Sequence, residues 1–202
     1  PKNKDGELLS SATGLFQTLD GTFARMGGKN KFVSKLDSMF SELRYWHGNE
    51  PCHQIAFLYN YVGEPWKTQK QISHIRNTEY VNAPGGLSGN DDAGQMSAWY
   101  VFSAMGFYPV CPGNPYYVIG SPAFEKMTIR LENGKEFVVK AHGVSAENIY
   151  IQSATLNGKI FEKSYITHKQ ILEGGILEFV MGAVPNKSWA AKKDNCPQSI
   201  LK

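Results

Sequence analysis

The residues best suited to chemistry lie in one turn-rich stretch, Gly89–Met96, which reads Gly-Asn-Asp-Asp-Ala-Gly-Gln-Met. The amide of Asn90 and the carboxylates of Asp91 and Asp92 stand directly before an apolar run. Adjacent carboxylates repel, so keeping both requires a cation, several N–H donors or solvent. One of them could simply cap a helix, but two caps are harder to explain. A carboxylate at a helix N-terminus stays ionised near neutral pH, which suits a general base acting on water.

A second polar cluster, Gly48-Asn49-Glu50-Pro51, precedes a short apolar segment, and His53 follows it. Glu50 adds a hard oxygen ligand to those of the aspartate stretch, and such ligands suit Ca²⁺ rather than zinc. The alternative is that Glu50 only caps the following helix. No two histidines have the i, i+4 spacing of a zinc motif, and the spacing of an EF-hand loop is also absent.

Three further side chains are candidates for contact with a polar ligand. Trp46 and His47 share the loop before Gly48, and a tryptophan at a loop rim can stack on a sugar ring. Core packing explains Trp46 equally well. Lys67 lies in the first turn of the next predicted helix, where contact with a ligand and simple solvation are both open.

Composition excludes several classes of function. The 202 residues carry a net charge of +3 without a basic stripe, which argues against nucleic-acid binding. No apolar run approaches the roughly 18 residues of a membrane span. Three cysteines without CxxC spacing leave one disulfide possible, and three free thiols are the preferred interpretation. A chain that begins at Pro1 without a signal peptide is expected to lack its natural N-terminus.

Two halves with different periodicity indicate an α+β fold. Helices are predicted over 30–43, 52–62, 65–80 and 93–105, with a loop over 81–92. Beyond Gly106 the pattern alternates, and Asn133-Gly134, Asn157-Gly158 and Gly174-Gly175 predict hairpins among six to eight antiparallel strands. We therefore divide the chain into helices over 1–108 and an antiparallel β module over 109–202.

The chain resembles glycoside hydrolase family 92, the calcium-dependent exo-α-mannosidases. The matching strings are collinear from about Gly27 to Trp189, which makes the resemblance specific. They are Gly48–Pro51, Lys67–Gln69, Gly89–Tyr100, Gly106–Pro109, Tyr117–Pro122, Tyr150–Ser153, Leu156–Gly158 and Pro185–Trp189.

The resemblance implies an architecture and a reaction. Family members carry an N-terminal β-sandwich and an (α/α)6 barrel, so the helices here would be the C-terminal part of that barrel. The rest of the barrel and the sandwich would lie in the parent chain or in another polypeptide. The implied reaction is hydrolysis of terminal mannose, with α-1,2 linkages expected, by inversion and with bound Ca²⁺. Such enzymes meet glycans outside the cytoplasm, so a secreted, periplasmic or cell-surface location is expected.

The resemblance also implies roles for single residues. Asp92 matches the family's base position, and Asn90 stands where many members carry another acid. Glu50 matches a calcium-ligand position, and His53 falls near the metal. The predicted catalytic carboxylates are therefore Asp92 and Asp91. The predicted metal ligands are Glu50, His53 and Asn49, and the predicted substrate contacts are Asn90, Trp46, His47, Lys67 and Gln95.

One departure from the family pattern concerns the general acid. The family's acid is a glutamate in a segment rich in Trp and Tyr, whereas Glu7 is the only candidate here and its surroundings do not match. A missing acid typically forfeits ~10²–10⁴ in rate. Two alternatives to a mannosidase piece stay open: a non-catalytic module that binds calcium and sugar, and a structural remnant with neither property.

Overall fold

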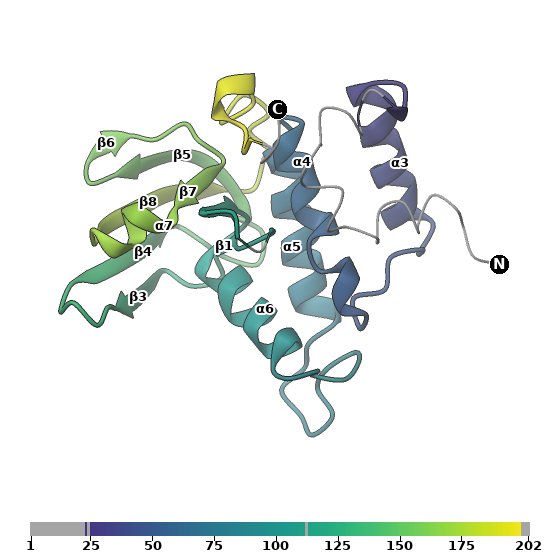
Figure 1. The fold of residues 1–202 in the computed structure, drawn as a ribbon, viewed down its shortest axis with the longest axis horizontal. Coiled ribbons are helices and arrows are strands. Elements are labelled where there is room, and N and C mark those ends of the chain that lie inside the picture. The colour runs from purple at the N-terminus through teal and green to yellow at the C-terminus, as the bar shows by residue number, and fades with distance from the viewer. Residues whose placement is uncertain (1–22, 24, 112, 199–202) are drawn as a thin grey trace.

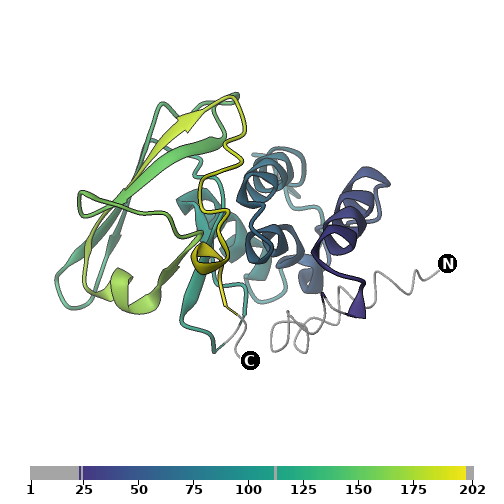
Figure 2. The same cartoon turned by 90° about the horizontal axis from the view of Figure 1, so that it is seen from above.

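Helices and strands occupy separate halves of the molecule (Figure 1). The computed structural model describes residues 23, 25–111 and 113–198, so Glu7 lies outside the described part. Seen from above, the helices form one side and the strands the other (Figure 2). Among the described residues, no helix is both long and apolar enough to cross a membrane.

The first described helix, α3 (Lys29–Ser41), confirms the helix predicted from position 30. It begins after Gly27 and Gly28, whose φ angles of 85° and 95° are open mainly to glycine. Phe32, Leu36 and Met39 are its buried residues, and their spacing places them on one face. That face packs into a core formed with the other helices.

The single helix predicted over 52–62 is wrong in detail. The structure has two 3₁₀ turns, η1 (Glu50–Cys52) and η2 (Ile55–Phe57), followed by the short α4 (Leu58–Tyr61). All residues from Ile55 to Asn60 are buried. A segment enclosed on every side follows tertiary packing rather than local helix propensity.

Helices α5 (Pro65–Thr78) and α6 (Gln95–Met105) confirm the next two predicted helices. The loop between them projects at the bottom of Figure 1, and a bridge between Tyr80 and Leu87 closes its first part. Helix α6 begins two residues later than predicted because Asp92 has a left-handed φ, as do the two residues after it.

The second half forms two sheets. The smaller has the order β1-β2-β7, and the larger β3-β4-β8-β5-β6. Helix α7 (His168–Leu172) follows β7 and starts with a capping box. A final 3₁₀ turn, η3 (Lys193–Asn195), lies near the C-terminus. The strands are β1 (Phe107–Tyr108), β2 (Tyr116–Ile119), β3 (Lys126–Arg130), β4 (Glu136–His142), β5 (Tyr150–Leu156), β6 (Lys159–Ile160), β7 (Tyr165–Thr167) and β8 (Gly175–Gly182).

The expectation of a purely antiparallel module is wrong, because β4 and β8 pair in parallel. The hairpins at Asn133-Gly134 and Asn157-Gly158 are confirmed as the β3–β4 and β5–β6 turns. Gly174-Gly175 instead follows α7. After β6 the chain leaves the large sheet to form β7 in the small one, and it returns through α7 to β8. This long connection allows β8 to run parallel to β4.

Buried polar side chains join the two halves. The Asn60 amide donates to the carbonyls of Ile119 and Ser164 at 2.8 and 3.0 Å. The Gln69 amide oxygen accepts from the Ile151 N–H at 3.0 Å. Tyr108 packs into the helical core, whereas its neighbour Phe107 packs into the β core. The division at 108/109 stays a prediction.

Candidate functional site

Two loops far apart in the sequence touch through glycines. A Cβ added to Gly48 would lie 2.6 Å from the Ser88 carbonyl oxygen, and one added to Gly89 would lie 2.4 Å from the Gly48 carbonyl oxygen. Only residues without a side chain permit this approach. It brings the loop with Asn49 and Glu50 against the loop that leads into α6.

The carboxylate of Asp91 caps helix α6. Its Oδ1 accepts from the Ser97 N–H at 2.8 Å, and its Oδ2 accepts from the Ser97 hydroxyl at 2.9 Å. The Met96 N–H also donates to the Asp91 carbonyl oxygen at 3.3 Å. Asp91 therefore satisfies free N–H groups at the helix start.

Asp92 presents a different picture, with an exposed side chain and a φ of 40°. Ala93 and Gly94 follow with φ values of 60° and 88°. Non-glycine residues in this region store of order 1–3 kcal/mol each, and such strain clusters at active sites. No hydrogen bond of the Asp92 carboxylate is found among the described residues, so it is open to a water molecule or a ligand.

His47 is fully buried and held by two tyrosines. The Tyr80 hydroxyl donates to the Met96 carbonyl at 3.1 Å, so its oxygen accepts from Nε2–H of His47 at 2.7 Å. The other ring nitrogen, Nδ1, accepts from the Tyr45 hydroxyl at 2.8 Å. Burial, and then the neighbouring His53, lower the pKa of His47 to about 3. The ring is therefore neutral and lies behind the site.

His53 lies under the start of α6, with both ring nitrogens engaged. Nε2 lies 3.1 Å from the His47 carbonyl oxygen and 3.3 Å from the Met96 sulfur. Nδ1 lies 3.5 Å from Nε2 of Gln95, which also donates to the Tyr108 hydroxyl at 3.1 Å. Burial lowers the pKa of His53, which favours the neutral ring.

Glu50 and Trp46 line the other loop. Glu50 Oε1 is buried, and no hydrogen-bond partner for it is found within the described part of the chain. An unpaired buried carboxylate oxygen is costly, and a cation would remove that cost. Trp46 is 58% exposed, so core packing within the described residues does not explain it. Asn49 and Asn90 are also exposed on the two loops.

Lys67 is the one predicted contact that the structure does not bring to these loops. Its ammonium binds Asp37 and lies over the rings of Tyr59 and Trp66. Lys67 is in the first turn of α5, whereas the site lies beyond the last turn. At 1.5 Å per residue, about 16 Å of helix separates Lys67 from the C-terminal end of α5.

The sequence did not single out the aromatic support of the site. Tyr45, Tyr80 and Tyr108 hold the polar groups, and the Tyr80 ring stacks on Trp99 at 5.9 Å. The indole N–H of Trp99 also donates to the His53 carbonyl at 3.0 Å. Only the aromatic content of 12% gave a signal, and it does not distinguish these rings from ordinary core.

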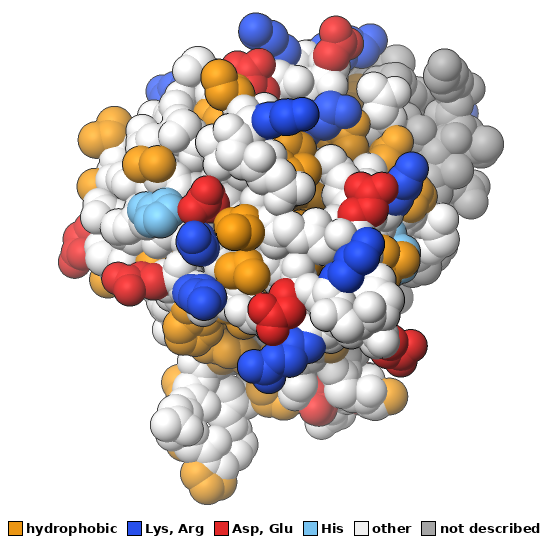
Figure 3. Space-filling view, turned by 90° about the vertical axis from the view of Figure 1, so that its left-hand side faces the viewer, with side chains coloured by type: hydrophobic (Ala, Val, Ile, Leu, Met, Phe, Trp, Pro, Cys, Tyr) orange, Lys and Arg blue, Asp and Glu red, His pale blue; other side chains and the backbone are white. Residues whose placement is uncertain are grey.

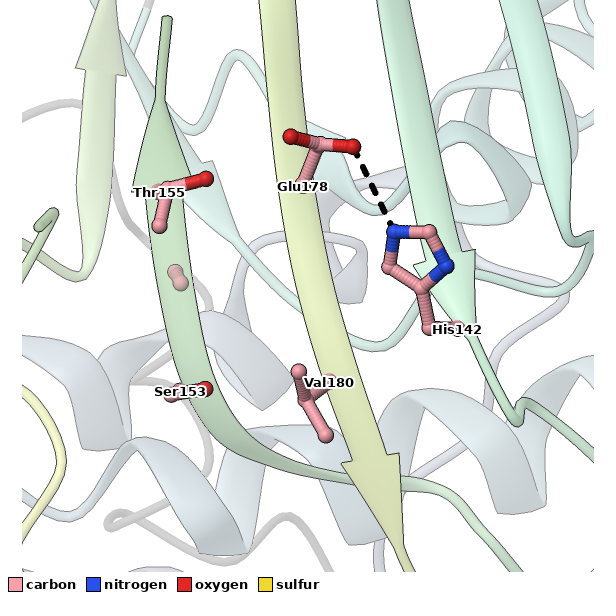
Figure 4. A pocket seen from close by; sticks show the side chains of 6 residues that line it. His142, Ser153, Thr155, Glu178 and Val180 are labelled. Carbon is pink, nitrogen blue, oxygen red and sulfur yellow. Dashed lines mark hydrogen bonds and ion pairs between the residues drawn. The ribbon is translucent and has the colours of Figure 1, made fainter. Parts of the chain in front are cut away.

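A depression on the large sheet lies on strands away from these loops. His142 Nε2 lies 3.4 Å from Glu178 Oε1 across it (Figure 4). On this side of the molecule, exposed hydrophobic side chains are scattered among charged ones (Figure 3). The depression carries no strain and no buried unpaired polar group. Its lining residues are His142, Ser153, Ala154, Thr155, Glu178 and Val180.

Comparison with known proteins identifies the family of the chain. The family model described as the glycosyl hydrolase family 92 catalytic domain matches residues 4–183. A protein from Arthroderma benhamiae described as an uncharacterized secreted glycosidase is 36% identical over 178 residues, which cover 87% of this chain and 23% of that protein.

Solved structures agree. An α-mannosidase of family GH92 from Bacteroides thetaiotaomicron is 47% identical with a TM-score of 0.83, over 86% of this chain and 24% of that chain. An inverting mannosidase of the same family and organism is 39% identical with a TM-score of 0.86, and the match covers 93% of this chain and 29% of that chain. This chain thus spans about a quarter of the length of the relatives it matches. From the extent of the match, the chain belongs to glycosyl hydrolase family 92.

Proposed function

We propose that the protein containing this chain is an exo-α-mannosidase that removes terminal mannose from glycans with inversion. The observation that carries the proposal is the contrast between two adjacent aspartates. Asp91 is bound on both oxygens to Ser97, whereas Asp92 is exposed on a strained turn. A family GH92 inverting mannosidase is among the similar structures.

In this proposal Asp92 acts as the general base. An inverting glycosidase needs a carboxylate that takes a proton from water while the water attacks the anomeric carbon. An unpartnered, solvent-facing carboxylate fits that task, and a positioned base typically contributes ~10²–10⁴ in rate. The Asp91 carboxylate fixes the turn instead, because its hydrogen bonds to α6 hold the preceding loop to the helix.

The residues also fit Ca²⁺. Within the described part of the chain, no group of three His, Cys, Asp or Glu residues could hold a metal. Calcium, however, takes amide, backbone and water oxygens as well. We propose Glu50 and Asn49 as ligands, since Glu50 Oε1 is buried without a partner. Glu50 and Asn49 would hold the ion beside the sugar, where it would supply Lewis-acid stabilisation.

His53 was predicted as a further ligand, and we propose another role for it because both of its ring nitrogens face protein groups. His47 is likewise buried between tyrosines, so its part in substrate binding is indirect. Direct sugar contacts are assigned to Trp46, Asn90 and Gln95, all of which are exposed.

The general acid is proposed to come from another part of the (α/α)6 barrel, beyond these 202 residues. The short coverage of the relatives supports this arrangement. A location outside the cytoplasm, as a secreted, periplasmic or surface enzyme, is proposed from the relative described as secreted. The substrate is proposed to be an α-1,2-linked mannoside.

The test uses the full-length polypeptide with α-1,2-, α-1,3- and α-1,6-linked mannobiose. We expect mannose release that is fastest on the α-1,2 linkage, stops with EDTA and returns with Ca²⁺. Proton NMR should show β-mannose as the first product, because inversion converts an α-linkage into a β-anomer. Release of α-mannose, or full activity in EDTA, would contradict the proposal.

The alternative is a non-catalytic module that binds sugar. It predicts mannose binding by the full-length protein without turnover. A purely structural role predicts neither binding nor a calcium-dependent rise in melting temperature. A metal that binds the native state stabilises it by about 2.7 kcal/mol at a hundredfold excess over Kd.

A further inference from the structure

The carboxamide of Gln95 is held from behind by two buried side chains. Gln95 is the first residue of α6 and follows the strained turn at Asp92. Its Nε2 contacts Nδ1 of His53 at 3.5 Å and the hydroxyl of Tyr108 at 3.1 Å. His53 is 1% exposed and Tyr108 is 7% exposed, whereas Gln95 itself is exposed.

The proton positions in this network follow from the acceptors. Among the described residues, the hydrogen-bond partners of His53 Nε2 are the carbonyl oxygen of His47 and the sulfur of Met96, and both are acceptors. Nε2 therefore carries the proton of the neutral ring. Nδ1 is then an acceptor, and the group that faces it must be a donor.

The same reasoning fixes the amide of Gln95. Only its NH2 group can donate to Nδ1 of His53, so a flipped amide would place an oxygen against a lone pair. Tyr108 accepts the second N–H. Both donors are then used, and no partner of Oε1 is found among the described residues. The carbonyl oxygen is left as an acceptor at the start of α6.

We propose that His53 and Tyr108 are positioning residues that hold Gln95 so that its Oε1 accepts a hydrogen bond from a hydroxyl of the bound mannoside. This inference rests on the proposed function. A sugar hydroxyl is a donor that matches a fixed carbonyl acceptor. A site built to bind a hydroxyl also rejects analogues that lack it, because its own polar group is left unpaired.

The first test is a double-mutant cycle in the full-length protein with Ca²⁺. Gln95→Ala should raise KM about five- to tenfold and change kcat less than twofold, since a neutral hydrogen bond is worth roughly 0.5–1.5 kcal/mol. Tyr108→Phe keeps the ring stacked on Phe57 and should raise KM about threefold. The double variant should match Gln95→Ala alone, because Tyr108 acts through Gln95.

A matched control is Tyr117→Phe, which removes a hydroxyl bound to the ring of His168 at 3.0 Å on the β module. Its KM should equal that of the wild type. If the rise in KM of the double variant equals the product of the two single rises, Tyr108 does not act through Gln95 and the positioning role is wrong. A rise in KM in Tyr117→Phe equal to that in Tyr108→Phe would also contradict it.

The second test identifies the partner of Oε1. The probes are the 2-, 3-, 4- and 6-deoxy mannosides. The analogue that lacks the hydroxyl bound by Oε1 should bind to the wild type as weakly as to Gln95→Ala. Each of the other three should bind to the wild type about five- to tenfold more tightly than to Gln95→Ala. Equal discrimination against all four analogues would show that Oε1 meets no sugar hydroxyl.

The third test does not depend on turnover. NMR of the protein labelled with 15N-histidine reports which ring nitrogen carries the proton. The His53 signals are assigned by their loss in His53→Gln, and they should show Nε2 protonated and Nδ1 unprotonated. A proton on Nδ1 would overturn the inference whatever the enzyme does. If mannose binds without turnover, calorimetric Kd values replace KM in the cycle and only the proposed function fails. If mannose neither binds nor reacts, both proposals fail.

Discussion

Gly48 and Gly89 lie back to back, so close that a Cβ on Gly89 would sit 2.4 Å from the Gly48 carbonyl oxygen and 2.7 Å from its Cα. This contact joins the loop of Glu50 to the loop of Asp92. The proximity of Glu50, proposed for metal binding, and Asp92, proposed for catalysis, therefore depends on glycine at positions 48 and 89.

Substitution Gly89→Ala should separate the loops. Neither Gly48 nor Gly89 has a positive φ angle, so alanine is not excluded by backbone conformation. The cost of Gly89→Ala comes instead from the clash of its Cβ with the backbone of Gly48. We expect a fall in kcat/KM of at least tenfold with a smaller change in melting temperature, measured on the full-length protein. A small displacement of catalytic groups is enough for such a loss.

The control for this substitution is Gly120→Ala. The three atoms nearest to its added Cβ would be side-chain atoms of Phe57 and Ile72, at 3.3 Å or more. Its kcat/KM should stay within about twofold of the wild type, since it leaves the loops in place. Normal activity of Gly89→Ala would show that the tight approach is not required.

Acid should destabilise the protein through His47. The folded pKa of about 3 lies below the ordinary value of 6.5, so the unfolded state binds more protons between these values. Stability is therefore complete above about pH 6.5 and is lost as the pH falls toward 3. The loss approaches about 1.4 kcal/mol per pH unit for one such group.

Melting temperatures between pH 4.5 and 7.5 test this linkage. His47→Gln should melt lower at pH 7.5 but depend less steeply on pH than the wild type. His74→Gln is the matched control, because His74 is exposed on α5 and should leave the slope unchanged. A wild-type slope retained in His47→Gln would assign the acid sensitivity to another group.

Arg76 should be the strongest single link between the helices and the sheets. It is 8% exposed, and its Nη1 donates to the carbonyls of Ser103 at 2.7 Å and of Ser121. Burial lowers its pKa to about 10, so it remains charged at neutral pH. Arg76→Met should cost roughly 2–3 kcal/mol, because charged donors contribute more and the carbonyls lose their partner.

Unfolding in urea measures this loss, with Arg130→Met for comparison. Arg130 is largely exposed and pairs with Glu136 at 3.4 Å, so its removal should change stability by less than about 0.5 kcal/mol. Equal effects of the two substitutions would rule out a special role for the buried arginine.

Sequence periodicity predicted the helices well and the sheets less well. The spacing of Phe32, Leu36 and Met39 predicted α3, and Asn133-Gly134 predicted the β3–β4 hairpin, because both signals are local. The parallel pairing of β4 with β8 depends on the chain leaving the large sheet to form β7 and returning through α7, which no local pattern records.

The site shows the same limit. The segment 90–92 could be found from residue types, yet the division of labour between Asp91 and Asp92 depends on the hydrogen bonds to Ser97. Lys67 matched a family string but binds Asp37 at the far end of α5. The first assignment depends on a local turn and the second on a contact between residues thirty positions apart, and residue types alone predict neither.

Asp92 is the proposed general base, and the substitution Asp92→Asn in the full-length protein tests this role. This change preserves shape and removes the proton acceptor. We predict a fall in kcat of about 10²–10⁴ with mannose binding retained, whereas Asp91→Asn should keep most activity and lower the melting temperature. Full activity of Asp92→Asn on α-mannosides would show that Asp92 is not the general base.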